Sequence, residues 1–180
     1  DVYFSSLWNE GSKIDPNSKS EPNTRSARLD TLVYGQDGLF GDRIIDVLKI
    51  DAETVDLKVV AGSTRLLLDQ RIRVVMWETP NHFPLETFPN DFGGPVKSFG
   101  QVMHRMDVYA GMSCYFPAKE HRTIKVTGAG CWEALDASPR CGTACPWGPT
   151  CPVDFGNVVC VSRTLAPALY RAMEAQALIY

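Results

Sequence analysis

The chain has 180 residues, of which 44% are hydrophobic and 10% aromatic, so it is long and apolar enough to form one domain with a buried core. Its formal net charge of -3 at pH 7 argues against nucleic-acid binding by this segment alone, because neutralising phosphates needs an excess of Lys and Arg. The absence of an 18-residue apolar run predicts no transmembrane helix, and the start at Asp1, without Met or a signal peptide, leads us to expect a processed or trimmed N-terminus.

The N-terminal part of the chain predicts two short strands separated by a loop. Residues 2–8 are apolar enough for an edge strand, whereas residues 11–28 are rich in Ser, Asn, Pro and charged side chains and form a partly flexible segment. The apolar run 29–34 predicts the second strand, and the Gly-containing sequence 35–38 predicts a turn after it.

The region 41–77 contains two runs rich in β-branched residues, which favour strands over helices. In the first run the apolar residues change from even to odd positions near Thr54, so we predict a bulge or a strand boundary there. In the second run, apolar side chains alternate with Arg71 and Arg73, which predicts a strand with one buried and one solvated face.

The C-terminal half alternates between loops and further predicted strands. Residues 79–100 contain four Pro and a Gly-Gly pair and predict a long surface loop, whereas 102–116, 121–126 and 156–162 have strand character. The tail is ambiguous. Pro167 and the Ala-rich sequence after it favour a helix, but the residues of odd number from Leu169 to Ile179 also form one face of a strand.

All six cysteines lie in the last 67 residues, at Cys114, Cys131, Cys141, Cys145, Cys151 and Cys160. An even number of Cys in a Gly- and Pro-rich region favours three disulfides, and these imply an oxidising compartment or an extracellular particle. Free buried thiols are an alternative. Zinc binding is disfavoured because the spacing C-x3-C-x5-C-x8-C matches no standard ligand pattern.

No catalytic or cofactor motif accompanies the three histidines, so we expect neither an enzyme nor a bound cofactor or metal. A hydrolase built around His104 and Asp107 remains a weaker hypothesis. Five aspartates could collect calcium at a subunit contact, although a solvated face fits their spacing better. The four tryptophans could form a sugar-binding platform, but core or interface anchoring is the more common role. These two sets are Asp30, Asp37, Asp42, Asp46 and Asp51, and Trp8, Trp77, Trp132 and Trp147.

Several short motifs occur in an order that is typical of one protein family. A G-D-x-I strand entry occupies 41–44, and the strand 71–77 ends in an aromatic residue before Pro80-Asn81. An R-x-x-V strand follows at 105–108, and two closing segments lie at 156–161 and 170–180. This arrangement resembles the single jelly-roll capsid proteins of small icosahedral viruses, of the satellite-virus or small single-stranded DNA virus type.

The resemblance implies an all-β fold over residues 1–180: an antiparallel eight-stranded jelly-roll sandwich with long Pro/Gly-rich loops, a Cys-rich loop and strand at 131–160, and a strand or short helix at the C-terminus. It also implies a structural protein of the virion that self-assembles into an icosahedral shell around a viral genome. The partners are then copies of itself and nucleic acid, the latter bound through a basic arm before Asp1. Candidate genome-facing residues are Arg25 and Arg28, and candidate interface anchors are Trp8, Trp77 and Trp147.

A secreted protein is the main alternative to a capsid subunit. The Cys-rich loop, the acidic balance and the start at Asp1 also suit a disulfide-stapled β-sandwich or β-barrel, such as an effector, a toxin or a lectin-like binding module. The Cys-rich loop fits this alternative better, because many capsid proteins assemble inside cells, where disulfides are disfavoured.

Overall fold

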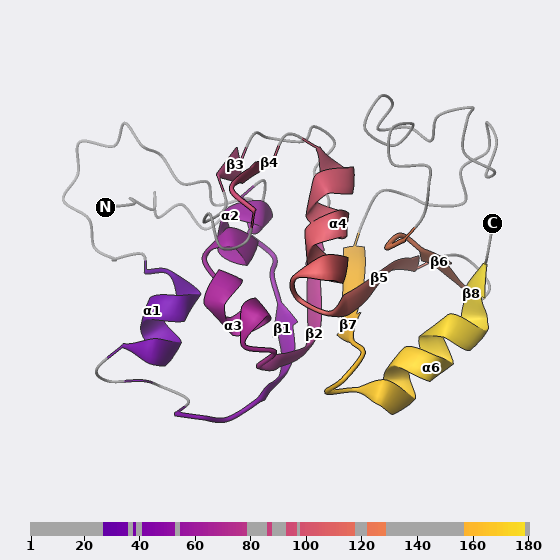
Figure 1. Cartoon of the computed structure of the whole chain (residues 1–180), viewed down its shortest axis with the longest axis horizontal. Helices are drawn as coiled ribbons and strands as arrows, with labels where there is room; N and C mark the ends of the chain where they lie inside the picture. The colour runs from indigo at the N-terminus through magenta and orange to yellow at the C-terminus, as the bar shows by residue number, and fades with distance from the viewer. Residues whose placement is uncertain are drawn as a thin grey trace, which may run out of the picture.

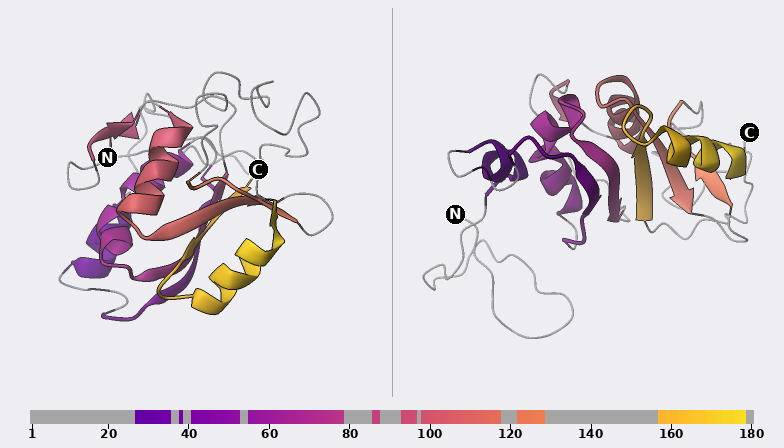
Figure 2. Two further views of the ribbon diagram at one scale, coloured as in Figure 1. Left: turned by 45° about the vertical axis from the view of Figure 1, so that its right-hand side comes forward. Right: turned by 90° about the horizontal axis from the view of Figure 1, so that it is seen from below.

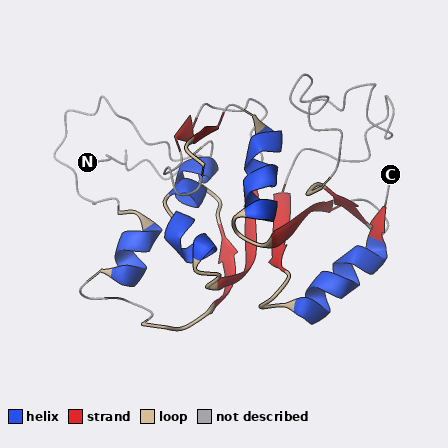
Figure 3. Cartoon of the chain, in the orientation of Figure 1, coloured by secondary structure: helices blue, strands red, loops and turns tan. Residues whose placement is uncertain are grey.

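The structure is a computed structural model that describes residues 27–35, 38, 41–52, 55–78, 86–87, 93–96, 98–117, 122–128 and 157–178. These residues form a six-stranded sheet flanked by helices, with the strand order β1-β2-β7-β5-β6-β8 (Figures 1 and 3). The strands of this sheet are β1 Ile45–Lys49, β2 Ile72–Glu78, β5 Met112–Pro117, β6 Thr123–Lys125, β7 Asn157–Ser162 and β8 Ala177–Leu178. A separate two-stranded ladder joins β3 Glu86–Thr87 to β4 Pro95–Val96. The helices are α1 Leu29–Tyr34, α2 Asp56–Ala61, α3 Thr64–Leu68, α4 Phe99–Val108 and α6 Pro167–Gln176.

This architecture contradicts the predicted all-β jelly roll. A jelly roll packs two antiparallel sheets against each other, whereas the described strands of the main sheet lie in one layer and include the parallel pairs β1–β2 and β6–β8. Helices, rather than a second sheet, cover the faces (Figure 3). The chain is therefore an α/β protein.

The parallel pair β1–β2 is connected through α2 and α3. Ile45 pairs with Ile72 and Lys49 with Met76 in this ladder. The sequence predicts a bulge or strand boundary near Thr54, and the structure has β1 ending at Lys49 and α2 beginning at Asp56. The element after this boundary is a helix because its buried residues Leu57, Val60 and Ala61 recur with helical spacing. Parallel neighbours need such a crossover because their connection must return along the sheet.

Two other predicted strands are helices. Residues 29–34 form α1, of which only Val33 is buried. The predicted strand 102–116 is divided into α4 and β5 by Gly111, whose φ of +64° suits glycine. The buried residues Phe99, Val102, Met103 and Met106 of α4 follow the i, i+3, i+4, i+7 pattern, and the Ser98 hydroxyl accepts a hydrogen bond from Gln101 N at 3.2 Å.

The centre of the sheet is antiparallel, with β7 inserted between β2 and β5. The predictions of strands at 71–77, 121–126 and 156–162 are confirmed by β2, β6 and β7. The prediction that the second strand, β2, has only one buried face is wrong. Val75 and Trp77 lie on one face and Ile72 on the other, and all three are buried. A strand inside an α/β sheet is covered on both faces.

Helices α4 and α6 cover opposite faces of the sheet (Figure 2). The Phe116 ring of β5 stacks on Phe99 of α4 with ring centroids 5.6 Å apart. The next side chain along the strand, Tyr115, points the other way and donates its hydroxyl hydrogen to Glu174 of α6. The ambiguous tail is thus a helix, α6, followed by the two-residue strand β8.

Candidate functional site

Two charged residues at the carboxyl end of β1 line a surface groove. Lys49 ends β1, and its Nζ forms an ion pair with Asp51 Oδ2 at 2.6 Å. Both side chains are 57% exposed, so this pair is solvated and adds little stability. The hydrogen bond that Lys49 donates to Asp51 raises the pKa of Lys49, which keeps the ammonium charged. Side chains at this edge are thus available to a ligand.

A buried carboxylate closes the turn from β1 to α2. Asp56 in the first turn of α2 is 3% exposed, and its Oδ1 accepts a hydrogen bond from the backbone N of Ala52 at 3.4 Å. A carboxylate at the start of a helix is also favoured by the helix dipole. Asp56 therefore fixes the path of the chain as it leaves the carboxyl end of β1.

A groove of about 590 Å³ lies between α1, the end of β1 and α2. Its apolar wall comes from all three elements. The charged residues that line it are Arg28, Lys49, Asp51 and Lys58. The larger apolar residues that line the groove are Leu29, Leu32, Leu48, Ile50, Val55 and Val59. The volume falls in the range of sites for small organic ligands, which are mostly apolar with a few polar groups.

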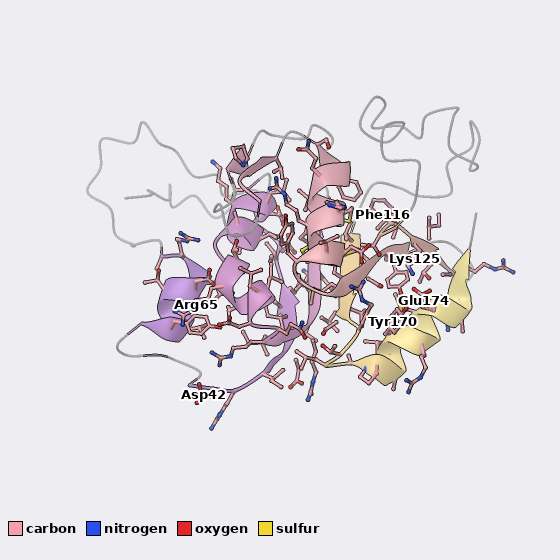
Figure 4. The ribbon with its side chains drawn as sticks, viewed as in Figure 1. Asp42, Arg65, Phe116, Lys125, Tyr170 and Glu174 are labelled. Atoms are coloured by element: carbon pink, nitrogen blue, oxygen red, sulfur yellow. A yellow bond between two sulfur atoms is a disulfide. The ribbon has the colours of Figure 1, made fainter. Side chains whose placement is uncertain are left out.

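A second polar cluster joins the C-terminal helix to the sheet (Figure 4). Lys125 Nζ lies 2.8 Å from Glu174 Oε1, which also accepts the hydrogen bond from Tyr115. Burial raises the pKa of Tyr115 well above its usual range, and the hydrogen bond to Glu174 adds to this effect. Burial alone would raise the pKa of Glu174, but the hydrogen bonds from Lys125 and Tyr115 lower it overall. The cluster is a partly buried attachment point for α6.

The structure brings two of the six cysteines together. Cys114 of β5 and Cys160 of β7 face each other across the ladder and form a disulfide, with Cα atoms 3.9 Å apart. The other four, Cys131, Cys141, Cys145 and Cys151, lie outside the described residues.

Of the candidate genome-facing and interface residues, the structure describes Arg28 and Trp77. Arg28 donates to the carbonyl oxygen of Ala61 at 3.3 Å and lies beside the groove. Trp77 is fully buried in the core, which corrects its assignment as an interface anchor, because it has no surface to offer a second copy. Arg25, Trp8 and Trp147 lie outside the described residues, as does Trp132.

Several of the residues considered for catalysis or calcium binding have other partners in the structure. Asp107, proposed to act with His104, accepts a hydrogen bond from Arg163 Nη1 at 2.6 Å. Asp30 accepts hydrogen bonds from α3, and Asp46 pairs with Arg73 of β2. Asp37 lies outside the described residues, and within the described part of the chain no three His, Cys, Asp or Glu side chains form a potential metal site.

The sequence reasoning missed the groove and the charged residues at its end. Lys49 and Asp51 flank Ile50 directly after a β-branched run, and charged residues at the end of a strand-like run are a recognisable signal. The residues after Lys49 were predicted to continue the strand, so the carboxyl end of β1 was not recognised.

The fold provides a candidate site, but neither the fold nor the sequence links this chain to a known protein. None of the described helices is long and apolar enough to span a membrane. Comparison of the chain with protein-family models, with curated proteins and with solved structures identified no match.

Proposed function

We propose that this chain binds a small organic molecule in the groove at the carboxyl end of β1. The observation that carries this proposal is the groove that opens at that edge, beside Lys49 and Asp51. In open α/β sheets, ligands bind outside the carboxyl ends of the parallel strands, because the crossover connections leave a crevice there. The position rests on this general property of the fold, whereas the ligand chemistry follows from the side chains.

The walls of the groove select an amphipathic ligand. Leu29, Leu32 and Val59 offer apolar surface from two helices, which suits a ring or a hydrocarbon chain. The charged residues are the cations Arg28, Lys49 and Lys58 and the single anion Asp51, an excess of positive charge. A ligand with an apolar body and an anionic group satisfies both features, and Asp51 would accept hydrogen bonds from any hydroxyl groups that it carries.

Two fluorescent probes test this chemistry. We expect 8-anilino-1-naphthalenesulfonate, an aromatic anion, to bind with one-to-one stoichiometry, and its neutral analogue N-phenyl-1-naphthylamine to bind more weakly. Lys58→Ala should weaken binding of the anion about fivefold to tenfold and leave the neutral analogue unchanged, because one charge-assisted contact is lost. Val59→Asp should weaken binding of both probes, because it places a charge in the apolar wall.

Arg171→Ala is the matched control for the loss of charge, since Arg171 is exposed on α6 and does not line the groove. Binding that Lys58→Ala and Val59→Asp leave unchanged would place the probe elsewhere and contradict the proposal. Thermal unfolding of each variant checks that the fold is intact.

Self-assembly into a viral shell stays a prediction. It depended on the jelly roll, which the mixed, helix-covered sheet replaces, so the geometry supports ligand binding better. The secreted alternative gains one favourable observation, the Cys114–Cys160 disulfide, because such bonds persist in oxidising compartments. Electron microscopy of the concentrated protein separates these hypotheses: icosahedral particles would support the shell.

A further inference from the structure

A second pocket, of about 460 Å³, lies between helices α1 and α3. The α1 residues that line it are Asp30, Thr31 and Tyr34, whereas Leu29 and Leu32 of the same helix line the groove. Because an α-helix has about 3.6 residues per turn, these two sets of residues lie on opposite sides of α1. The pocket is therefore a separate candidate site.

The lining of this pocket is polar, unlike that of the groove. Its charged residues are Arg28, Asp30 and Arg65, so positive charge is in excess. Thr31 is exposed on α1 and provides a hydroxyl group. The Tyr34 ring is the large apolar group in the lining, and the Arg65 guanidinium already covers it, with Cζ 3.8 Å from the ring centroid. These groups favour a polar, anionic ligand over an apolar one.

The two arginines are not hydrogen-bonded to the carboxylates beside them. The Asp30 oxygens accept from the backbone of α3, at 2.9 Å from Arg65 N and 3.1 Å from Leu66 N. Arg28 Nη2 lies 3.9 Å from Asp30 Oδ2, and Arg65 Nε lies 3.6 Å from Asp69 Oδ2. Both of these distances are longer than a hydrogen bond. The carboxylates therefore leave the guanidinium donors unused.

Both guanidinium groups keep donors for a ligand. Each carries several N–H groups in a planar fork. Within the described part of the chain, Arg28 donates one side-chain hydrogen bond, from Nη2 to Ala61 O at 3.3 Å, and the Arg65 guanidinium donates none. The two side chains are 57% and 62% exposed, so an anion can reach both.

We propose that this pocket binds a small, hydroxylated phosphate monoester, with its phosphate group between Arg28 and Arg65. A phosphate monoester is close to a dianion at neutral pH, so two guanidinium groups can balance its charge. Arg also matches phosphate oxygens with paired N–H donors. The pocket volume leaves room for a polar body whose hydroxyl groups can bond to Thr31. A nucleic acid fits less well, because the chain has a net charge of -3.

Isothermal titration calorimetry at neutral pH tests this pocket with ribose 5-phosphate as the probe and ribose and inorganic phosphate as comparisons. We expect ribose 5-phosphate to bind with one-to-one stoichiometry and at least about tenfold more tightly than either comparison, because it offers both the dianion and the hydroxyl groups. Arg65→Gln should weaken this binding at least about fivefold, because it removes the charge and the paired donors. Arg171→Gln is the matched control, since it removes a charge from the exposed face of α6, away from the pocket.

The two sites can be tested independently, because Arg65 lines only this pocket and Lys58 only the groove. Arg65→Gln should leave binding of 8-anilino-1-naphthalenesulfonate unchanged, and Lys58→Ala should leave binding of ribose 5-phosphate unchanged. Equal binding of ribose 5-phosphate to the Arg65→Gln and Arg171→Gln variants would overturn the proposal. Binding no tighter than that of ribose, or than that of inorganic phosphate, would also overturn it, the latter because the pocket would then hold an adventitious ion only. If Arg65→Gln does not fold, Arg28→Gln provides the test and should weaken binding of ribose 5-phosphate to a similar extent.

Discussion

The Asp30 carboxylate caps helix α3 from a distance of 35 residues in sequence by accepting a hydrogen bond from the backbone N of Arg65 at 2.9 Å. Its second oxygen accepts from Leu66 N at 3.1 Å. The first N–H groups of a helix have no partner within the helix, so this carboxylate replaces a local cap and ties α1 to α3. In Figure 4, Arg65 lies at this junction, where its guanidinium stacks over the Tyr34 ring at 3.8 Å.

Asp30→Ala should lower the free energy of unfolding by about 1–2 kcal/mol, because two backbone N–H groups at the start of α3 lose their acceptor. Urea unfolding followed by circular dichroism measures this change. Asp42→Ala is the control: Asp42 lies in an exposed turn, and its loss should change stability by less than about 0.5 kcal/mol. Equal effects of both substitutions would show that Asp30 is not a cap.

Glu174 should make the stability of the chain depend on pH in the acidic range. Its pKa is lowered in the folded state because the hydrogen bonds from Lys125 and Tyr115 outweigh its burial. A lowered pKa means that the folded state binds the proton more weakly than the unfolded state. The stabilisation is therefore present above the ordinary pKa of Glu and is lost as the pH falls through the folded value.

Glu174→Gln should flatten this acidic part of the stability curve, as measured by urea unfolding at a series of pH values between 3 and 7. The substitution keeps the shape of the side chain and removes its charge. An exposed acidic residue that makes no contact with α6, such as Asp42, provides the comparison, since Asp42→Asn should leave the slope almost unchanged. A slope that Glu174→Gln does not reduce would contradict the assignment.

Arg105 holds the segment that leads to β4. Although only 8% exposed, it donates through Nη2 to Gly93 O at 2.7 Å and to Pro95 O at 3.0 Å, and through Nη1 to Gly94 O. Arg105→Met should destabilise the fold by about 2–4 kcal/mol, because these carbonyl groups lose their donors. Chemical unfolding measures the loss, and Arg105→Lys, which keeps the charge, should recover part of it.

Gly93 packs directly against the Arg105 guanidinium. Its φ is +87°, and a Cβ atom there would lie 3.0 Å from Arg105 Nε. Gly93→Ala should therefore destabilise by about 1–3 kcal/mol, through both the backbone conformation and the displaced guanidinium. In an Arg105→Met background, the steric part of the Gly93→Ala penalty should be smaller. Strictly additive changes in the free energy of unfolding would contradict a direct contact between the two residues.

The Cys114–Cys160 disulfide closes a loop with a sequence separation of 46 residues. Chain-entropy arguments give a stabilisation of about 4 kcal/mol for a loop of this length. Replacing both residues by Ala should lower the unfolding free energy by an amount of this order. Mass spectrometry after alkylation without reductant should find neither thiol labelled in the unfolded protein, and labelling of both would contradict the bond.

The strands of this sheet could be predicted where β-branched residues are dense, as in β2 and β7. The helix α4 could have been predicted as well, because Ser98 precedes Phe99, Val102 and Met106 at helical spacing. We predicted a strand there because Val108, Met112 and Phe116 share one parity, which is also compatible with a helix end followed by a strand. Apolar residues of one parity were also taken as a strand at α2, so neither this helix nor the groove that it lines was predicted.

By itself, the sequence determined the extended segments that became β2, β6 and β7 and the helical preference after Pro167, because these preferences come from side-chain branching and proline within a few positions. Only the tertiary structure decided that β1 and β2 run parallel, that β7 enters between β2 and β5, and that Cys114 meets Cys160. Those relationships depend on burying several apolar faces at once between segments up to about one hundred residues apart, so no local pattern contains them. The groove beside β1 follows from that arrangement.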